Sequence, residues 1–319
     1  MEKKSLVILT GPTAVGKTAL SLALARQIGG EIVSADSMQI YKYMDIGSAK
    51  ISREEMAGIS HHLIDVLDPR EPFSVVAFQQ MARAAMEGIY GRGHIPILVG
   101  GTGFYIQAVV RDITFTESED DPAFRAACDA LVQKEGPEAL HNKLKKIDPA
   151  SAEAIHPHNS KRVTRALEYY HLTGQPISAH NMEQQQKESP YAFAYFVLND
   201  KREKLYEQID RRVERMLAAG LLDEVRRLSA MGCSRRHISM QGLGYKELLD
   251  YLDGKIRYEE AVYQIKRDTR HFAKRQITWF KRERDVIWIN KDDFGYDDQQ
   301  MLTFMIQTMA KRGIHYPVS

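Results

Sequence analysis

The chain has 319 residues, of which 44% are hydrophobic and 27% are charged, and it carries 44 Lys and Arg against 42 Asp and Glu. This composition is ordinary for folded protein and the length suffices for two domains, which excludes wholesale disorder. Apolar runs are too short for a membrane span or a signal peptide, and two cysteines exclude a disulfide framework or a Cys-based zinc site. We therefore expect a cytoplasmic protein with no membrane partner.

Short apolar runs bounded by glycine alternate with helical segments in the first hundred residues. Strands are predicted over Leu6–Leu9, Glu31–Ala35 and Ile95–Val99, with a further candidate over Leu63–Val66. Helices are predicted over Ala19–Ile28 and from a Ser74 cap to about Tyr90. This alternation is typical of an α/β fold with a parallel sheet flanked by helices.

The pattern changes near Thr114. From Asp121 to about Tyr170 the periodicity is helical and is interrupted by Pro137, Pro149 and Pro157, and residues 184–189 read as a polar, mobile loop. Strands return over Ala194–Leu198 and Val286–Ile289. We predict an α/β catalytic core of residues 1–114 and 191–319 with basic C-terminal helices. An all-helical domain over residues 115–190 is inserted into it.

The first loop has the G-x-x-x-x-G-K-[ST] pattern of a P-loop, after a strand and before a helix. Its residues are Gly11, Pro12, Thr13, Ala14, Val15, Gly16, Lys17 and Thr18. Glycines let backbone N–H groups converge on phosphate oxygens, the helix N-terminus attracts anions, Lys17 adds a full charge, and the Thr18 hydroxyl can hold Mg²⁺. The core is therefore predicted to be P-loop NTPase-like, with this loop binding a diphosphate.

The signatures of nucleotide hydrolysis are missing. An ATPase needs an apolar strand that ends in Asp, but the 95–99 strand is followed by Gly100-Gly101-Thr102, and no base-reading Asn-Lys-x-Asp occurs. The sequence therefore predicts a transfer reaction. Two classes remain at this point: a small-molecule kinase, and a transferase that releases diphosphate.

Asp36 and Thr102 each follow a predicted strand. Ligands of open parallel sheets lie beyond the carboxyl ends of the strands, so both side chains are expected beside the P-loop. A carboxylate near a diphosphate suits a metal, a base or a substrate hydrogen bond. The alternative for each residue is a helix cap.

Positive charge is concentrated between Lys201 and Arg284, with 21 Lys and Arg against 13 Asp and Glu. This segregation indicates a polyanionic partner, although solvated helix faces would produce it too. Lys266, Arg270 and Lys274 recur every four residues and predict a cationic stripe. Ile265, Phe272 and Trp279 fall on another face and are interpreted as core.

Several segments resemble the tRNA dimethylallyltransferase family, from one end of the chain to the other. They are GPTAVGKT (11–18), SADSMQIYKYMDIGSAK (34–50), HHLIDVLDP (61–69), LVGGTGFY (98–105), KRVTRALE (161–168), GYKEL (244–248) and KRQITWF (274–280). The resemblance implies that dimethylallyl diphosphate places its diphosphate in the P-loop. The N6 amine of the adenosine at tRNA position 37, 3′ of the anticodon, attacks the allylic carbon.

The resemblance also implies residue roles. Asp36 takes the N6 proton, Thr102 stabilises the leaving oxygen, and diphosphate departs with Mg²⁺. Arg212 matches an arginine that reaches the diphosphate, although the adjacent Arg211 leaves the register open. Contacts to the tRNA anticodon stem-loop are implied for Asp36 and for Ser37, Met38, Gln39, Ser160, Lys161, Arg162, Val163, Thr164, Gln241, Gly242, Leu243, Gly244, Tyr245 and Lys246. Arg125 in the helical insertion is a further candidate for this role.

Other interpretations remain at this stage. A P-loop small-molecule kinase would use the insertion as a lid, and an RNA-binding module would use the P-loop as a switch; neither explains the basic C-terminal part together with Asp36 and Thr102. Eukaryotic members of the family carry a C-terminal zinc finger, and this sequence has no Cys/His set for one. It therefore resembles the bacterial form of the family. We expect a monomer. His61-His62 and His156-Pro157-His158 are interpreted as structural or surface residues.

Overall fold

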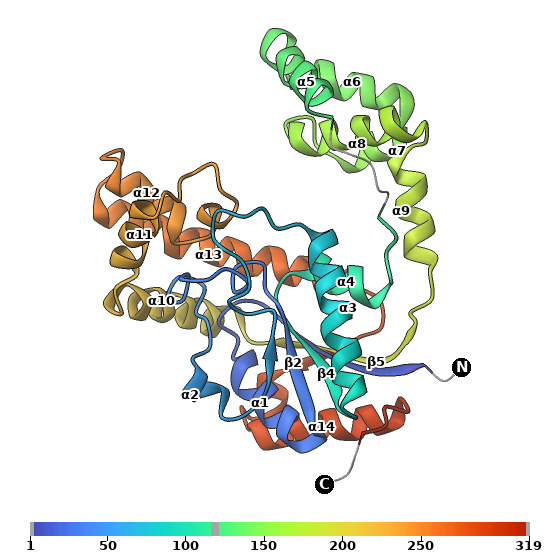
Figure 1. Cartoon of the computed structure of the whole chain (residues 1–319), viewed down its shortest axis with the longest axis vertical. Coiled ribbons are helices and arrows are strands. Elements are labelled where there is room, and N and C mark those ends of the chain that lie inside the picture. The colour runs from blue at the N-terminus through green and yellow to red at the C-terminus, as the bar shows by residue number, and fades with distance from the viewer. Residues whose placement is uncertain (1–2, 116–120, 317–319) are drawn as a thin grey trace. The chain divides into compact units, whose positions relative to one another are not determined.

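The computed structural model describes residues 3–115 and 121–316 of the chain (Figure 1). The chain divides into two compact units, one formed by residues 1–110 and 190–319 and the other by residues 111–189. From the sequence we predicted that the insertion begins at residue 115 and ends at residue 190, close to these boundaries. Each unit is described by itself below.

The larger unit is built on a six-stranded sheet in the order β3-β2-β4-β1-β5-β6. Every neighbouring pair is parallel. The strands are β1 (Lys4–Thr10), β2 (Gly30–Ala35), β3 (His61–His62), β4 (Ile95–Gly100), β5 (Tyr191–Asn199) and β6 (Val286–Asn290). Because β2, β4 and β1 are adjacent, with Ala35 and Thr10 both in register with Gly100, the loops after these three strands emerge side by side.

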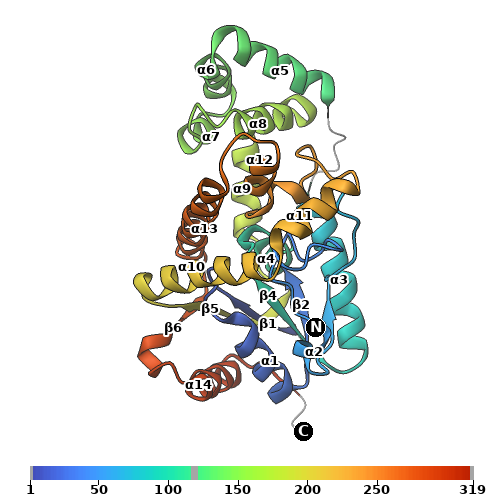
Figure 2. The ribbon, with the colours of Figure 1, turned by 90° about the vertical axis from the view of Figure 1, so that its left-hand side faces the viewer.

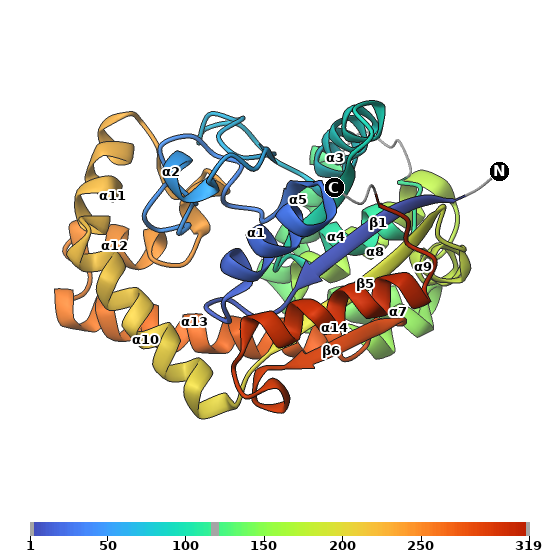
Figure 3. The ribbon, with the colours of Figure 1, turned by 90° about the horizontal axis from the view of Figure 1, so that it is seen from below.

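Helices cover both faces of the sheet. One face packs against α1 (Lys17–Ile28) and α14 (Asp298–Lys311), the other against α3 (Val75–Gly91) and α4 (Gly103–Val110), as Figures 2 and 3 show. Side chains of β1 alternate between the two cores: Leu6 and Ile8 lie in one, Val7 and Leu9 in the other. This two-residue period is what a strand buried on both faces requires.

The C-terminal helices form a second layer of the larger unit. They are α10 (Arg202–Ala218), α11 (Leu221–Ala230), α12 (Tyr245–Leu252) and the long α13 (Tyr258–Phe280), which contacts α10, α12 and α4. Shorter elements complete the unit: α2 (Arg53–Met56), η1 (Ser239–Gln241) and η2 (Lys291–Phe294). Through its contact with α4, α13 brings its second half next to the sheet edge.

The smaller unit is helical in its described residues. It contains α5 (Pro122–Glu135), α6 (Pro137–Ile147), α7 (Pro149–Ala154), α8 (Ser160–Thr173) and α9 (Ile177–Gln186). Proline opens α5, α6 and α7, which suits the first turn because its missing N–H would have no helical acceptor there. Leu140, Leu144 and Val163 are among the residues of a separate core.

Most predicted elements are confirmed, including the Ser74 cap, whose side chain accepts a hydrogen bond from the Ala77 N–H. Two predictions are wrong. Residues 63–66 form no strand of the sheet: Leu63 and Asp65 have φ of 64° and 56°, and Val66 N–H donates to Ile40 O in a neighbouring loop. The loop expected over 184–189 begins later, because α9 extends to Gln186, and the buried Gln184 accepts a hydrogen bond from Thr114 N–H at 2.9 Å.

Candidate active site

A cavity of about 430 Å³ lies at the carboxyl edge of the sheet. Its walls come from the P-loop, from the residues after β2 and β4, and from helices α10 and α13. The lining residues are Thr13, Ala14, Gly16, Lys17, Thr18, Asp36, Gln39, Ala49, Gly101, Gln208, Arg211, Arg212, Arg215, Phe272 and Gln276. The expected convergence of the P-loop and Asp36 is therefore present in the fold.

The P-loop conformation depends on its glycines. Gly11 has φ of 145°, and a Cβ there would lie 2.2 Å from the Leu198 carbonyl oxygen, so no side chain fits. Gly16, with φ of 98°, precedes the first residue of α1, Lys17. The Lys17 Nζ donates to the carbonyl oxygens of Gly11 and Pro12 at 2.9 and 2.8 Å. The loop thus curls around the lysine that we expect to meet a phosphate.

Positive charge in the cavity lacks full compensation. Burial lowers the pKa of Lys17 to about 7, with a further lowering from Arg212 and an opposing contribution from Asp36. The pKa of Arg212 is likewise lowered by burial and by Arg215, and raised by Asp36. Within residues 3–115 and 121–316, neither cation forms an ion pair. An entering anion would relieve this repulsion, which is what a diphosphate site requires.

Asp36 and Thr102 lie next to one another at the ends of β2 and β4. Asp36 Oδ1 accepts a hydrogen bond from Met38 N–H at 2.8 Å, so the carboxylate stabilises a turn and no helix. Thr102 Oγ1 accepts from Ser37 N–H at 3.3 Å, while its carbonyl oxygen, and not its hydroxyl, accepts from the first turn of α4. Neither side chain is therefore a helix cap. Asp36 lines the cavity directly, and Gly101, next to Thr102, does so too.

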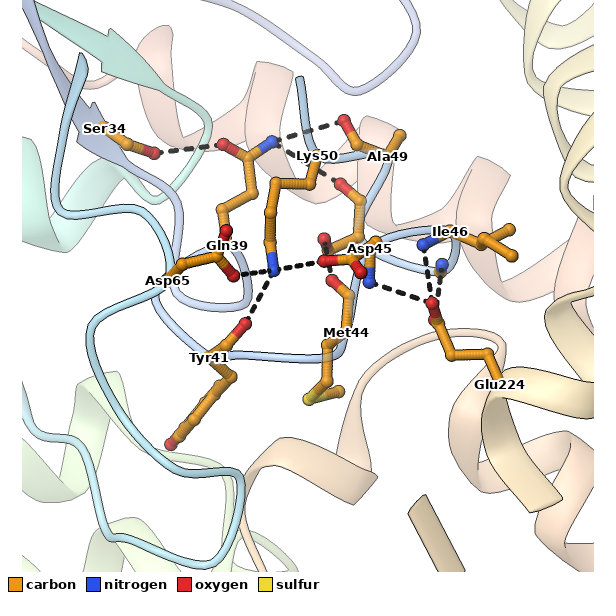
Figure 4. A network of polar contacts seen from close by, with 12 residues as sticks. Ser34, Gln39, Tyr41, Met44, Asp45, Ile46, Ala49, Lys50, Asp65 and Glu224 are labelled. Carbon is orange, nitrogen blue, oxygen red and sulfur yellow. Dashed lines mark hydrogen bonds and ion pairs between the residues drawn. The ribbon is translucent and has the colours of Figure 1, made fainter. Parts of the chain in front are cut away.

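The wall formed by residues 39–50 is held by two charged side chains (Figure 4). Glu224 of α11, 1% exposed, accepts hydrogen bonds from the N–H groups of Asp45, Ile46 and Gly47 at 2.8–3.0 Å. Lys50 Nζ lies 2.7 Å from both Tyr41 O and Asp45 Oδ1 and 2.6 Å from Asp65 Oδ1. Such a network fixes the loop that carries Gln39 and Ala49 into the cavity.

The segment expected to contact tRNA around residues 241–246 divides into exposed and buried residues. Gln241 is exposed, and Gly242, Leu243 and Lys246 are half-buried. Tyr245 is the clearest correction, because it is 1% exposed and its hydroxyl donates to Glu224 Oε1 at 2.7 Å. A Cβ on Gly47 would lie 2.5 Å from the Tyr245 ring, so the tyrosine packs against the 39–50 loop and supports it.

The smaller unit divides its expected tRNA residues in a similar way. Lys161 and Arg162 are exposed and Ser160 is half-buried, at the start of α8. Val163 and Thr164, 0% and 8% exposed, point into the helical core and are corrected to structural residues. Arg125 holds the fully buried Glu168 at 2.7 and 2.9 Å, so its guanidinium is already engaged inside the unit. Because side chains of a helix repeat every 3.6 residues, a run of consecutive helical residues always includes some that face the core.

The stripe predicted along α13 is also corrected. Lys266 Nζ lies 2.6 Å from Glu214 Oε1, and Arg270 Nη1 lies 2.6 Å from Asp210 Oδ1; both acids belong to α10. Lys274 remains exposed. Two of the three cations therefore tie α13 to α10, and the stripe is smaller than its sequence period suggests.

Of the three α13 residues interpreted as core, Ile265 and Trp279 pack in or against the core of the larger unit, and Phe272 differs. Ile265 is buried, but Phe272 lines the cavity and Trp279 is half-buried under Gly103, where a Cβ would lie 2.2 Å from the indole. Gln208, Arg215 and Gln276 of the cavity were not predicted from the sequence, although Gln276 lies in the KRQITWF segment. The signal for Gln276 is a polar side chain between buried Ala273 and Phe280 on the apolar face of a helix.

The histidine pairs do not form a metal site. His62 Nε2 lies 2.7 Å from Glu31 Oε2, and His61 Nδ1 lies 2.9 Å from Ile59 O. Across the described part of the chain, no group of three or more His, Cys, Asp or Glu could hold a metal ion. In the same residues, no helix is both long and apolar enough to cross a membrane.

The chain matches known proteins over nearly its whole length. A family model described as IPP transferase matches residues 39–283, and one described as isopentenyl transferase matches residues 4–68. The tRNA dimethylallyltransferase of Lachnoclostridium phytofermentans is 58% identical over 309 residues, which are 97% of this chain and 98% of that protein.

Solved structures of similar sequence share the fold. The full-length tRNA isopentenylpyrophosphate transferase of Bacillus halodurans is 44% identical, with 98% of each chain covered and a TM-score of 0.73. The tRNA Δ(2)-isopentenylpyrophosphate transferase of Staphylococcus epidermidis is 40% identical, covering 97% of this chain and 100% of that one, with a TM-score of 0.72. A eukaryotic dimethylallyltransferase acting on tRNA is 29% identical, covering 99% and 82%, with a TM-score of 0.80. The chain belongs to the IPP transferase family, as its motifs indicated, and it is a prenyltransferase.

Proposed function

We propose that this enzyme transfers the dimethylallyl group of dimethylallyl diphosphate to N6 of the adenosine at tRNA position 37 and releases diphosphate. The observation that carries the proposal is the single cavity that Lys17, Arg212 and Asp36 share. It offers cations for a diphosphate and a carboxylate for an amine. Relatives named as tRNA dimethylallyltransferases over nearly the whole chain support this choice of substrates.

The diphosphate would lie in the P-loop. Backbone N–H groups at the start of α1, the Lys17 ammonium and the Arg212 guanidinium supply the positive potential. Charge neutralisation matters because the bond to the allylic carbon breaks with both electrons going to the diphosphate oxygen. Thr102, next to Gly101 of the cavity wall, would hydrogen-bond that leaving oxygen.

Asp36 would act as the base. The N6 lone pair of adenine is delocalised into the ring, so the amine is a poor nucleophile until its proton is removed. A carboxylate positioned for that proton contributes about 10²–10⁴ in rate in typical enzymes. Asp36 suits this role because the turn hydrogen bond from Met38 N–H fixes its orientation and its carboxylate lines the cavity.

A divalent metal fits the oxygen donors of the cavity. Thr18 lines the cavity and its hydroxyl is an oxygen donor, and oxygen ligands are those that Mg²⁺ prefers. Because the described residues contain no cluster of three acidic or histidine ligands, diphosphate oxygens would have to supply much of the coordination. We propose Mg²⁺ as that ion, whose chemistry is to neutralise the charge of the leaving diphosphate.

Recognition of tRNA is proposed for three exposed or half-buried places. They are Ser37–Gln39 beside the cavity, Gln241–Leu243 with Lys246 on the larger unit, and Ser160–Arg162 on the helical insertion over residues 115–190. The adenine must leave its stack to reach a cavity of this kind, and the anticodon loop is a single-stranded region that allows it.

Labelled substrates test the proposal. We expect label from the dimethylallyl group to move to tRNA that lacks the modification, with no transfer from γ-labelled ATP and none without tRNA. Digestion of the product should place the label on N6 of one adenosine. Transfer of phosphate from ATP to a small acceptor would instead support a kinase, and an unlabelled tRNA in both reactions would reject the proposed function.

A further inference from the structure

Gln276 joins two loops of the active site. It lies in the second half of α13 and is 6% exposed. Its Oε1 accepts a hydrogen bond from Thr13 N–H at 2.8 Å, and its Nε2 donates to Gly101 O at 2.9 Å. Because one partner is a donor and the other an acceptor, the two bonds define the orientation of the amide.

The two partners belong to loops that follow two neighbouring, paired strands. Strand pairing aligns Thr10 with Gly100, and the Thr10 hydroxyl donates to Gly100 O at 2.7 Å. Thr13 and Gly101 lie beyond this point, and the side chain of Gln276 spans them. A Cβ on Gly101 would lie 2.2 Å from Nε2, so the glycine makes room for the bridge.

We propose that Gln276 is a positioning residue for prenyl transfer. Through the bridge, α13 sets the P-loop, which carries the diphosphate, relative to the loop that carries Thr102. This inference rests on the proposed roles of those two loops. It also assigns the Thr13 N–H to Gln276, so this amide is committed to the protein and not to the diphosphate.

The placement on α13 makes the bridge effective. Phe272, one turn earlier on the same helix, lines the same cavity, and the ion pair of Arg270 with Asp210 ties this stretch of α13 to α10. A helix held in this way is a rigid support, and a shift of about 1 Å in a reacting group can lower a rate about 10²-fold. Loss of the bridge should therefore affect the chemical step more than tRNA binding.

Two variants separate the contributions of the bridge. Gln276→Met keeps the volume but leaves a buried N–H and a buried carbonyl unpaired, which should lower kcat about 5- to 100-fold while the KM for tRNA stays within about twofold. Gln276→Glu keeps an acceptor for Thr13 N–H but, when ionised, places an oxygen against Gly101 O. A protonated carboxyl can donate to that carbonyl, so the kcat of Gln276→Glu relative to wild type should rise from about pH 8.5 to about pH 6.

The pH comparison accounts for the other charged groups of the cavity. These are Lys17, Asp36 and the three arginines of α10, and their titration is common to both proteins, so it largely cancels in the ratio. Gln276→Met should show no such recovery. Thr278→Ala is the matched control, because Thr278 is exposed and its hydroxyl donates to Lys274 O within α13; its kcat and KM should be those of wild type.

The outcomes are distinguishable from failure of the proposed function. Wild-type kcat in both Gln276 variants, or a ratio for Gln276→Glu that does not change with pH, would overturn the inference. If wild type itself transfers no prenyl group, the affinity for inorganic diphosphate measured by calorimetry still tests the bridge: Gln276→Met should bind at least about fivefold more weakly. Equal affinities would also overturn it.

Discussion

Strand β2 has a carboxylate at each end, and the structure satisfies the two differently. Glu31, near its start, is 4% exposed and is contacted by Arg92, His62 and His94 at 2.7–2.8 Å. Asp36, just after its end, accepts one hydrogen bond from Met38 N–H and faces a cavity that also contains Lys17 and Arg212. The first site is complete within the protein, whereas Lys17 and Arg212 in the second have no ion pair among the described residues.

Buried charges at the two ends of β2 differ in whether the protein itself compensates them. Chiefly through its hydrogen bonds with Arg92, the pKa of Glu31 is lowered to about 2, so the group is a stable anion with a structural role. At the other end, burial lowers the pKa of Lys17 to about 7. Keeping this ammonium charged in the cavity therefore costs free energy, which the binding of diphosphate would offset. An ionisable side chain with a shifted pKa is a candidate for catalysis or binding when it lies in a cleft and lacks ion-pair partners. One whose charge is fully paired within the protein is a candidate for a structural role.

The largest expected effect tests Asp36 as the base. Asp36→Ala should lower kcat for prenyl transfer by at least about 10², while inorganic diphosphate still binds, because the carboxylate acts on the amine and not on the diphosphate. Asp36→Asn is the informative partner, since its amide oxygen can keep the turn bond to Met38 N–H. If Asp36→Asn transferred the prenyl group at the wild-type rate, Asp36 would be a turn residue like the structural acid at the other end of β2.

The next effect compares two neighbouring arginines. Arg212 is half-buried and has no ion pair among the described residues, whereas Arg211 is exposed and lies 2.5 Å from Glu207. Arg212→Gln should weaken inorganic diphosphate binding about 10- to 100-fold, since a charge-assisted contact in a buried site contributes about 1.5–3 kcal/mol. Arg211→Gln should change it less than about threefold. Calorimetry measures both, and the reverse order would place Arg211 at the diphosphate.

A smaller effect concerns protons at Lys17. With a pKa of about 7, the free enzyme loses this ammonium as pH rises through that value, and a bound diphosphate favours its return. We therefore expect proton uptake on binding of inorganic diphosphate at about pH 8, and weaker binding at about pH 8.5 than at about pH 6.5. Calorimetry in buffers of different ionisation enthalpy measures the uptake. Lys17→Met corrects for titration of the ligand, and identical uptake in that variant would contradict the assignment.

The sequence predicted the site edge well because local patterns determine it. The P-loop spacing, the apolar β2 run before Asp36 and the 95–99 strand before Thr102 each occupy a few residues, and topology brings their ends together. The family resemblance added roles that these patterns leave open. Prediction of position was therefore strongest where a strand end defines it.

Partners distant in the sequence could not be predicted in this way. The pairing of Arg270 with Asp210, of Tyr245 with Glu224 and of Gln276 with Thr13 depends on how α10–α13 pack, which no local period encodes. A contiguous motif also hides burial, as Val163 and Tyr245 illustrate. RNA contacts on a helix can therefore be assigned only when it is known which face of the helix is exposed.

The smallest effect on activity is expected for substitution of Glu31. The same substitution should cause the largest loss of stability among these variants. Its pKa is lowered from 4.5 to about 2, so its contribution is complete above pH 4.5 and is lost as pH falls through about 2. Glu31→Gln should lower the free energy of unfolding by on the order of 3 kcal/mol at neutral pH, with kcat within about twofold of wild type. Denaturant titrations should show this difference shrinking below about pH 4.5.

Glu87→Gln is the control, because its pair with Lys4 is exposed and such pairs contribute about 0–1 kcal/mol. A Glu31→Gln enzyme with normal stability but a tenfold lower kcat would remove the distinction between the two ends of β2, since a complete partner set would then no longer mark a structural site.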